Sequence, residues 1–221
     1  MSVALRLLRV CFDGRITTSE LSMFRGAMIA MSGGNPLFHN HAAEGFRYSY
    51  PKIQYKLDGG CPSVLGIGEG ASALAEMFDG NAGFTCRLGR RLFATEVSSI
   101  AEWEEEVSFV PSPVTYLIHD WLPLNAGNFK DYRAAGGMIE RLAMLQRILL
   151  GNILSFAKGM GIFFHDEVGC SIMDMQSTGT STFKGVDLMS FSGRFSTNVR
   201  LPQWIGLGKA SSLNHGTIIR I

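Results

Sequence analysis

The fold is decided by residues 48–67, YSYPKIQYKLDGGCPSVLGI. Residues 48–57 are rich in aromatic side chains, and apolar and polar residues alternate, as is typical of a β-strand. Asp58-Gly59-Gly60 follows, a combination that favours a tight turn. A second apolar run extends from Ser63 to Ile67. The stretch therefore predicts a β-hairpin.

Elements on both sides extend this hairpin to a ferredoxin-like unit. Val3 to Phe12 predicts a preceding strand, and Thr17 or Thr18 could cap a helix after it. That helix is expected because apolar residues recur at spacings of three and four: Leu21, Phe24, Met28 and Met31. After the hairpin we expect a short helix from Ala71 to Phe78 and a fourth strand around Arg91 to Val97. The order β-α-β-β-α-β is the ferredoxin-like pattern.

The second half of the chain follows the same order less regularly. Val114 to Leu124 is extended and comes after Pro111 and Pro113, and a long helix is expected from Asp131 to Phe156. The expected buried stripe of that helix comprises Ile139, Leu142, Leu145, Leu149 and Ile153. Three further strands are expected over 168–175, 186–191 and 217–221. The predicted class is α+β, with two ferredoxin-like units in tandem over residues 1–106 and 107–221.

Composition limits the class of protein. Of the 221 residues, 46% are hydrophobic and the net charge is only +1, which excludes a disordered chain. The longest apolar stretches are too short to span a bilayer, and residues 1–6 lack the pattern of a signal peptide. The four cysteines form no Cys-x-x-Cys pair, which argues against a zinc ribbon or a disulfide framework. We therefore expect a cytoplasmic protein with no membrane partner.

Two histidines stand two residues apart in Phe38-His39-Asn40-His41. In an extended backbone, His39 and His41 would point to the same side. Cleavage of RNA by its own 2′-hydroxyl needs a base and an acid, and histidine can serve as either near neutral pH. The alternatives are an ordinary exposed loop or half of a metal site, for which His119, His165, His215 or the cysteines would have to supply the other ligands.

Two other segments could contact RNA phosphates. In a strand, Lys52, Gln54 and Lys56 would share one face, although a solvated polar face is the simpler interpretation. The glycine-rich segment 206–216 could bring backbone amides close to a phosphate, and its Lys209 adds charge, although a plain turn explains the glycines equally. Residues 170–221 carry five basic and two acidic residues, so a local basic face is possible there.

Together these segments resemble the CRISPR pre-crRNA endoribonucleases of the Cas-six family, closest to its b-type branch. The resemblance is carried by residues 37–41 (LFHNH), 47–56 (RYSYPKIQYK), 66–70 (GIGEG) and 204–218, in this order along the chain. It implies two ferredoxin-like units of the RAMP or RRM-like kind, and metal-independent cleavage of CRISPR repeat RNA that leaves 2′,3′-cyclic phosphate and 5′-hydroxyl ends. It implies no metal and no cofactor.

The resemblance also implies roles for individual residues. His39 and His41 fall on the catalytic pair, and Lys56 or Tyr55 on a group near the phosphate. The residues expected to bind RNA are Lys52, Tyr55, Gly206, Gly208, Lys209, His215 and Gly216. It leaves open whether the protein is a homodimer and whether it joins a CRISPR effector complex.

One segment departs from the family. Where the family's loop usually has Ser-Arg-Gly-Phe-Gly, this chain has Ser212-Leu213-Asn214-His215-Gly216. His215 could stack on a base in place of the aromatic residue. The altered loop also motivates an alternative function, a module of the same fold that binds repeat RNA without cutting it.

Overall fold

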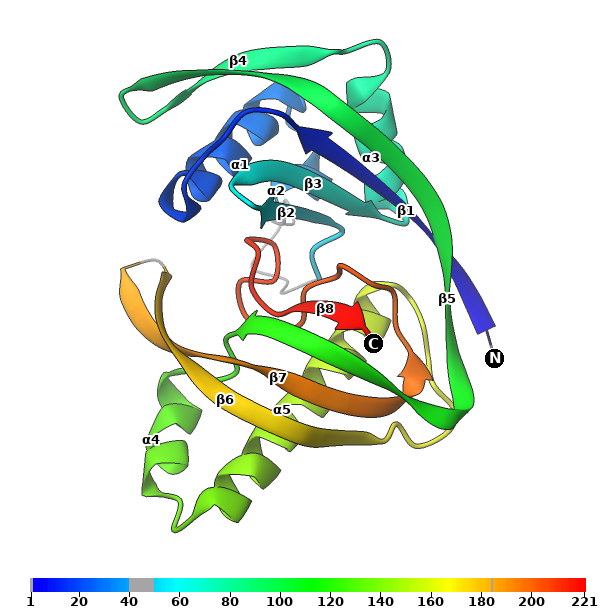
Figure 1. The fold of residues 1–221 in the computed structure, drawn as a ribbon. Helices are drawn as coiled ribbons and strands as arrows, with labels where there is room; N and C mark the ends of the chain where they lie inside the picture. The colour runs from blue at the N-terminus through cyan, green and yellow to red at the C-terminus, as the bar shows by residue number, and fades with distance from the viewer. Residues whose placement is uncertain (1, 40–49, 184) are drawn as a thin grey trace. The chain divides into compact units, whose positions relative to one another are not determined.

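The computed structural model describes residues 2–39, 50–183 and 185–221, and it divides into two compact units (Figure 1). The N-terminal unit comprises residues 4–105 together with Ser212–Asn214. The C-terminal unit comprises residues 106–211 and 215–221, together with Ser2 and Val3. Three residues from late in the sequence are therefore part of the first unit.

The N-terminal unit contains four strands that are neighbours in one sheet, which is covered by helices on one face. Its strands are β1 (Ser2–Phe12), β2 (Ile53–Asp58), β3 (Cys61–Ile67) and the first part of β5 (Arg91–Trp121), in the order β2-β3-β1-β5. Its main helices are α1 (Leu21–Met31) and α3 (Glu69–Phe78). The predicted hairpin is confirmed, because β2 pairs with β3 from Ile53 opposite Gly66 to Asp58 opposite Cys61. This strand order is that of a ferredoxin-like unit.

The core of this unit lies between the helices and one face of the sheet. The buried residues include Phe24 and Met28 of α1, Leu74 of α3, and Val10 and Tyr55 of the sheet. Phe12 packs edge-on against Phe24 and Phe84. Met31 is 40% exposed, so the buried apolar stripe of α1 is one residue shorter than the sequence predicts.

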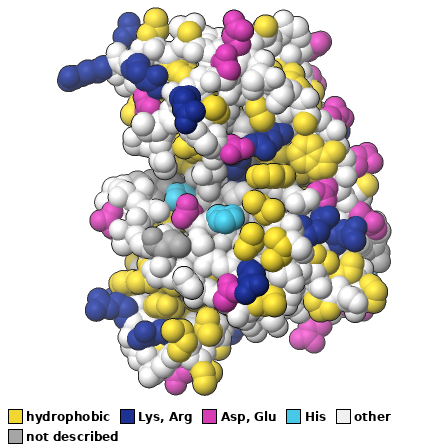
Figure 2. Space-filling model, in the orientation of Figure 1, with side chains coloured by type: hydrophobic (Ala, Val, Ile, Leu, Met, Phe, Trp, Pro, Cys, Tyr) yellow, Lys and Arg dark blue, Asp and Glu magenta, His cyan; other side chains and the backbone are white. Residues whose placement is uncertain are grey.

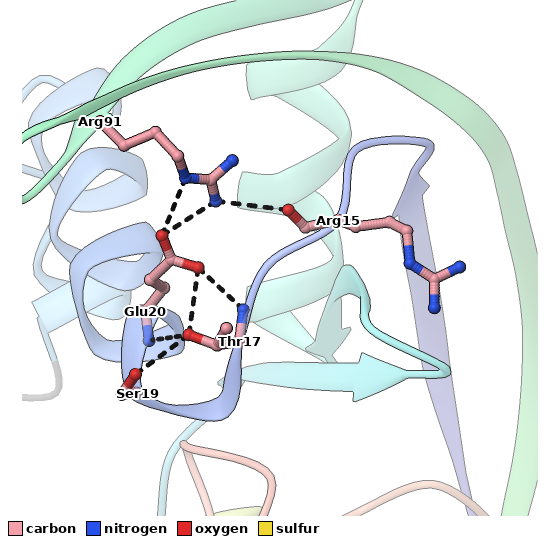
Figure 3. Close-up of polar contacts among 5 residues, drawn as sticks. All are labelled: Arg15, Thr17, Ser19, Glu20 and Arg91. Atoms are coloured by element: carbon pink, nitrogen blue, oxygen red, sulfur yellow. Dashed lines mark hydrogen bonds and ion pairs between the residues drawn. The ribbon is translucent and has the colours of Figure 1, made fainter.

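The start of α1 is held by a capping box (Figure 3). A 3₁₀ turn, η1 (Thr18–Glu20), precedes the helix, and Thr17 is the capping residue. The Thr17 hydroxyl accepts from the amide of Glu20 at 3.3 Å, and the Glu20 carboxylate accepts from the amide of Thr17 at 2.9 Å. Arg91 forms an ion pair with Glu20 at 2.9 Å and donates to the carbonyl of Arg15. The first residue of β5 is thus tied to the start of α1.

The strand β5 is much longer than predicted. The sequence suggests separate strands near 91–97 and 114–124, whereas one strand extends without a break from Arg91 to Trp121. Its first part pairs with β4 (Gly83–Leu88), a strand that the sequence pattern does not predict. Pro111 and Pro113 lie within β5, where the pairing register shifts between Phe109 and Val114. The prolines mark a bulge, because a proline cannot donate to the ladder.

The C-terminal unit is a second, reduced ferredoxin-like sheet. It combines the last part of β5 with β6 (Cys170–Phe183), β7 (Val186–Arg200) and β8 (Thr217–Arg220), and β5 pairs with both β7 and β8. The order is β8-β5-β7-β6, which matches that of the first unit. Residues 201–216, which connect β7 to β8, contain no helix. The second unit therefore lacks the helix that α3 provides in the first.

The predicted helix over 131–156 is in fact two helices, α4 (Ala126–Ala134) and α5 (Met138–Gly159). Gly136 and Gly137 lie between them. Leu145, Leu149 and Ile153 of the predicted stripe are buried, but Ile139 is 85% exposed at the start of α5. The α5 helix contacts β6, where the Gln146 side chain accepts from the amide of Ile172 at 3.2 Å.

Candidate active site

His39 is the last residue of a short helix, α2 (Pro36–His39), and its side chain is half-buried. Asn35 begins this helix, because its side-chain oxygen accepts from the amide of Leu37 at 3.0 Å. The extended geometry expected around His39 is therefore wrong as far as the described residues reach. Its expected partner, His41, lies outside the described residues, so the pair remains a prediction.

Arg25 of α1 lies beside His39, and Tyr55 of β2 lies within reach of the Arg25 charge. Arg25 Nη2 donates to the backbone carbonyl of His39 at 2.9 Å. The Tyr55 side chain is fully buried in the core of the N-terminal unit. Burial raises the pKa of its hydroxyl, and the positive charge of Arg25 nearby offsets part of that rise. Tyr55 therefore points away from any exposed surface on which RNA could lie.

The polar residues of β2 differ from the solvated face that the sequence suggests. Lys52 precedes the strand and forms an ion pair with Glu69 at 2.9 Å. Gln54 and Lys56 share the face opposite Tyr55, and both are buried. Only Lys52 keeps the partial exposure of a surface lysine.

Lys56 is 4% exposed, and its surroundings lower the pKa of its amino group. Burial, together with the positive charge of Arg9, lowers the pKa of Lys56 from 10.5 to about 7. Arg9 itself donates to Ser63 at 3.2 Å and pairs with Asp58. Ser63 is the β3 residue directly opposite Lys56. A lysine in this state can release or accept a proton near neutral pH.

The glycines of the terminal loop are required by packing in the C-terminal unit. Gly208 has a φ of +85°, and a Cβ there would lie 2.7 Å from the indole nitrogen of Trp121. Gly216 has a φ of +64°, and a Cβ would lie 2.0 Å from the carbonyl of Leu207. A Cβ on Gly206 would meet the carbonyl of Ser211 at 2.7 Å. A side chain at any of these three positions would therefore force neighbouring atoms to move.

The polar groups of this loop are largely bonded within the unit. The carbonyl of Asp120 accepts from the amide of Gly216 at 3.3 Å and lies 3.1 Å from Nδ1 of His215. Because a carbonyl only accepts, His215 must carry a proton on Nδ1 in this contact. Lys209 is exposed. Of the loop residues expected to bind RNA, Lys209 thus presents the most accessible side chain.

Residues Ser212–Asn214, two of which are altered, extend the edge of β2. The Ser212 carbonyl accepts from the amide of Tyr55 at 2.9 Å, and the Asn214 side chain accepts from the amide of Leu57 at 3.2 Å. Leu213 packs against the core of the N-terminal unit. Asn214 has a φ of +64°, a conformation that asparagine tolerates better than most residues. Where the family usually has glycine, asparagine therefore keeps the same left-handed backbone conformation.

In the part of the chain that the structure describes, the surface charges and the cysteines do not indicate a further ligand or metal at this site. On the face shown in Figure 2, Lys and Arg side chains form small groups with Asp and Glu side chains among them. The four cysteines are free. Within residues 2–39, 50–183 and 185–221, no group of three His, Cys, Asp or Glu side chains could hold a metal ion. No helix in these ranges is long and apolar enough to cross a membrane.

Comparison with known protein families assigns the chain. Residues 3–106 match the N-terminal domain of Cas6b, and residues 109–221 match its C-terminal domain. The chain belongs to the Cas6b family. The resemblance drawn from the sequence motifs is therefore confirmed, and a Cas6b fold explains the two ferredoxin-like units.

Solved structures agree with this assignment. A crystal structure of Cas6b has a TM-score of 0.84 and 23% identity, and the alignment covers 99% of this chain and 100% of that one. The crystal structure of a CRISPR RNA processing endoribonuclease Cas6b has a TM-score of 0.76 and 22% identity, with the same coverage. At these identities the likeness shows the fold. An uncharacterized protein of Methanocaldococcus jannaschii is 26% identical over 118 residues, which is 53% of this chain and 79% of that protein.

Proposed function

We propose that this Cas6b protein is an endoribonuclease of CRISPR RNA processing that cuts within repeat RNA. The single observation that carries the proposal is the match of both halves of the chain to the two Cas6b domains. A solved relative of the same fold is itself a CRISPR RNA processing endoribonuclease. The substrate is the precursor RNA that contains the CRISPR repeats.

The chemistry that we propose is attack by the 2′-hydroxyl on the adjacent phosphorus. A base takes the hydroxyl proton, the new O–P bond closes a 2′,3′-cyclic phosphate, and the bond to the 5′-oxygen breaks. An acid protonates that oxygen, which leaves as a hydroxyl. His39 and His41 are the proposed acid and base, with no metal. Lys56, whose pKa is lowered to about 7, or Lys209 would stabilise the charge that develops on the phosphate.

The test is single-turnover cleavage of the host's own repeat RNA in excess EDTA. Wild-type protein should cut, and His39→Ala should cut about 10²-fold more slowly while binding RNA equally well. His165→Ala is the matched control, because His165 is an exposed histidine on a loop of the other unit. A substrate with a 2′-deoxy group at the cut should bind and stay intact. Cleavage of that substrate would rule out 2′-hydroxyl attack.

The alternative function is a module that binds repeat RNA without cutting it. The observation that favours it is the departure at residues 213–215 from the family's loop. It predicts tight binding of repeat RNA and no cleavage at any pH. The cleavage experiment described above therefore separates the two functions.

The sequence leaves open whether the protein is a homodimer. Sedimentation with and without RNA would test this.

A further inference from the structure

Arg25 of α1 forms a hydrogen bond to the end of another helix, α2. Arg25 is half-buried and directly follows Phe24, which is part of the core. Its Nη2 donates to the carbonyl of His39 at 2.9 Å, across fourteen residues of sequence. His39 ends α2, and the last carbonyls of a helix have no partner within it. Arg25 therefore supplies the hydrogen bond that the end of α2 lacks.

The surroundings of Arg25 are unusual for a residue with only a capping role. Among the described residues, its Nε is buried and has no hydrogen-bond partner, and the same is true of the Tyr55 hydroxyl. The Arg25 charge lies close enough to influence the Tyr55 hydroxyl. A buried polar atom without a partner destabilises a fold by about 1–3 kcal/mol. Of the polar atoms at this place, Nη2 of Arg25 is the one that is bonded to His39.

We propose that Arg25 is a positioning residue, which fixes the backbone of His39 and thereby the orientation of its imidazole toward the RNA. Tyr55 is fully buried near the Arg25 charge, and its hydroxyl takes no part in binding or cleavage. The inference rests on the proposed function, because it assigns Arg25 a role through His39. A displaced catalytic group can reduce the rate about 10²-fold even when the group itself is intact.

The test compares Arg25→Met, Arg25→Lys and Tyr55→Phe in single-turnover cleavage, RNA affinity and urea unfolding. Arg25→Met keeps a long apolar stem but loses the bond to His39, so cleavage of bound RNA should fall about 10- to 100-fold. RNA affinity should stay within about threefold, because the residue contacts protein rather than RNA. Arg25→Lys can still donate to the carbonyl and should recover most of the rate. Tyr55→Phe is the matched control and should cut and bind as the wild type does.

A double-mutant cycle with His39→Ala distinguishes positioning from general destabilisation. If Arg25 acts through His39, Arg25→Met should have no further effect once His39 is alanine. Equal losses in both backgrounds would overturn the inference, as would a wild-type rate for Arg25→Met. These outcomes leave the proposed function intact when His39→Ala is itself slow. A wild-type rate for His39→Ala would instead reject the proposed role of His39, and the role of Arg25 with it.

Discussion

The indole nitrogen of Trp121 donates to the side-chain oxygen of Asn152 at 2.9 Å, which links the end of β5 to the middle of α5. Gly208 lies against the same two atoms, and a Cβ there would be 2.7 Å from the indole nitrogen and 2.8 Å from the oxygen. Trp121 is fully buried. The terminal loop therefore packs against a partly buried hydrogen bond of the C-terminal unit.

Gly208→Ala should lower the free energy of unfolding by about 2–3 kcal/mol, since the new methyl group forces a shift in a packed region and φ is positive there. Urea unfolding measures the change. Gly151→Ala is the matched control, because its Cβ in α5 would meet nothing within 4 Å and alanine favours a helix by about 1 kcal/mol. A fully stable Gly208→Ala variant would contradict the packing role of this glycine.

Lys56→Met should raise stability at pH 7 and slow cleavage. The pKa of Lys56 is about 7 when folded and near 10.5 when unfolded, so between these values the unfolded chain binds the extra proton. The contribution of Lys56 to stability therefore rises as pH rises from 7 to 10.5. We expect the variant to be about 1–4 kcal/mol more stable than the wild type at pH 7, with a smaller difference at pH 10. Urea unfolding across this pH range measures it.

Lys56→Arg provides the opposite case at the same position. A guanidinium does not lose its proton in this pH range, so the buried charge should reduce stability by about 3 kcal/mol. A stable arginine variant with normal unfolding at pH 7 would show that the site accepts a charge. A methionine variant that cleaves RNA at the wild-type rate would remove Lys56 from the proposed chemistry.

Substitutions at Asn214 should separate its backbone role from its side-chain role. Asn214→Asp keeps an acceptor for the amide of Leu57, and should unfold close to the wild type. Asn214→Gly suits the positive φ but loses the acceptor, which costs about 1 kcal/mol. Asn214→Ala loses both the acceptor and the tolerance of a positive φ, and it should lower the free energy of unfolding by about 2 kcal/mol. Equal stability of the glycine and alanine variants would show that the left-handed conformation contributes nothing.

Lys209→Ala should weaken RNA binding more than it slows cleavage. The side chain is exposed on the terminal loop and is expected to contact about one phosphate. Its loss should reduce the slope of log K against log salt by roughly one unit or less. Binding measured from low to high salt gives the slope. An unchanged affinity at every salt concentration would place the RNA elsewhere on the protein.

The sequence predicts the hairpin and the ferredoxin-like order well, because alternation and turn residues are local signals. It does not predict that Pro111 and Pro113 lie inside one strand, since a bulge depends on the partner strand. The break between α4 and α5 had a visible signal in Gly136-Gly137, which the helical periodicity obscured.

In the candidate site, too, some features have a local sequence signal and others depend on packing. Asn35-Pro36 is a typical helix start, and it could have placed His39 in a helix rather than in an extended loop. The burial of Lys56 could not be predicted from alternation, because periodicity separates the two faces of a strand but does not say what covers each. The bond from Arg25 to His39 depends on how α1 and α2 pack, for which the sequence has no local signal.

The short extension of β2 by residues 212–214 has a consequence during synthesis. A ribosome completes β1, β2 and β3 early, yet the amides of Tyr55 and Leu57 find their partners only when Ser212 and Asn214 have emerged. Until then the nascent protein has an open sheet edge, on which a neighbouring polypeptide could add a strand. Products truncated before residue 212, by a stop codon or a protease, would keep that edge and should aggregate more readily than the full chain.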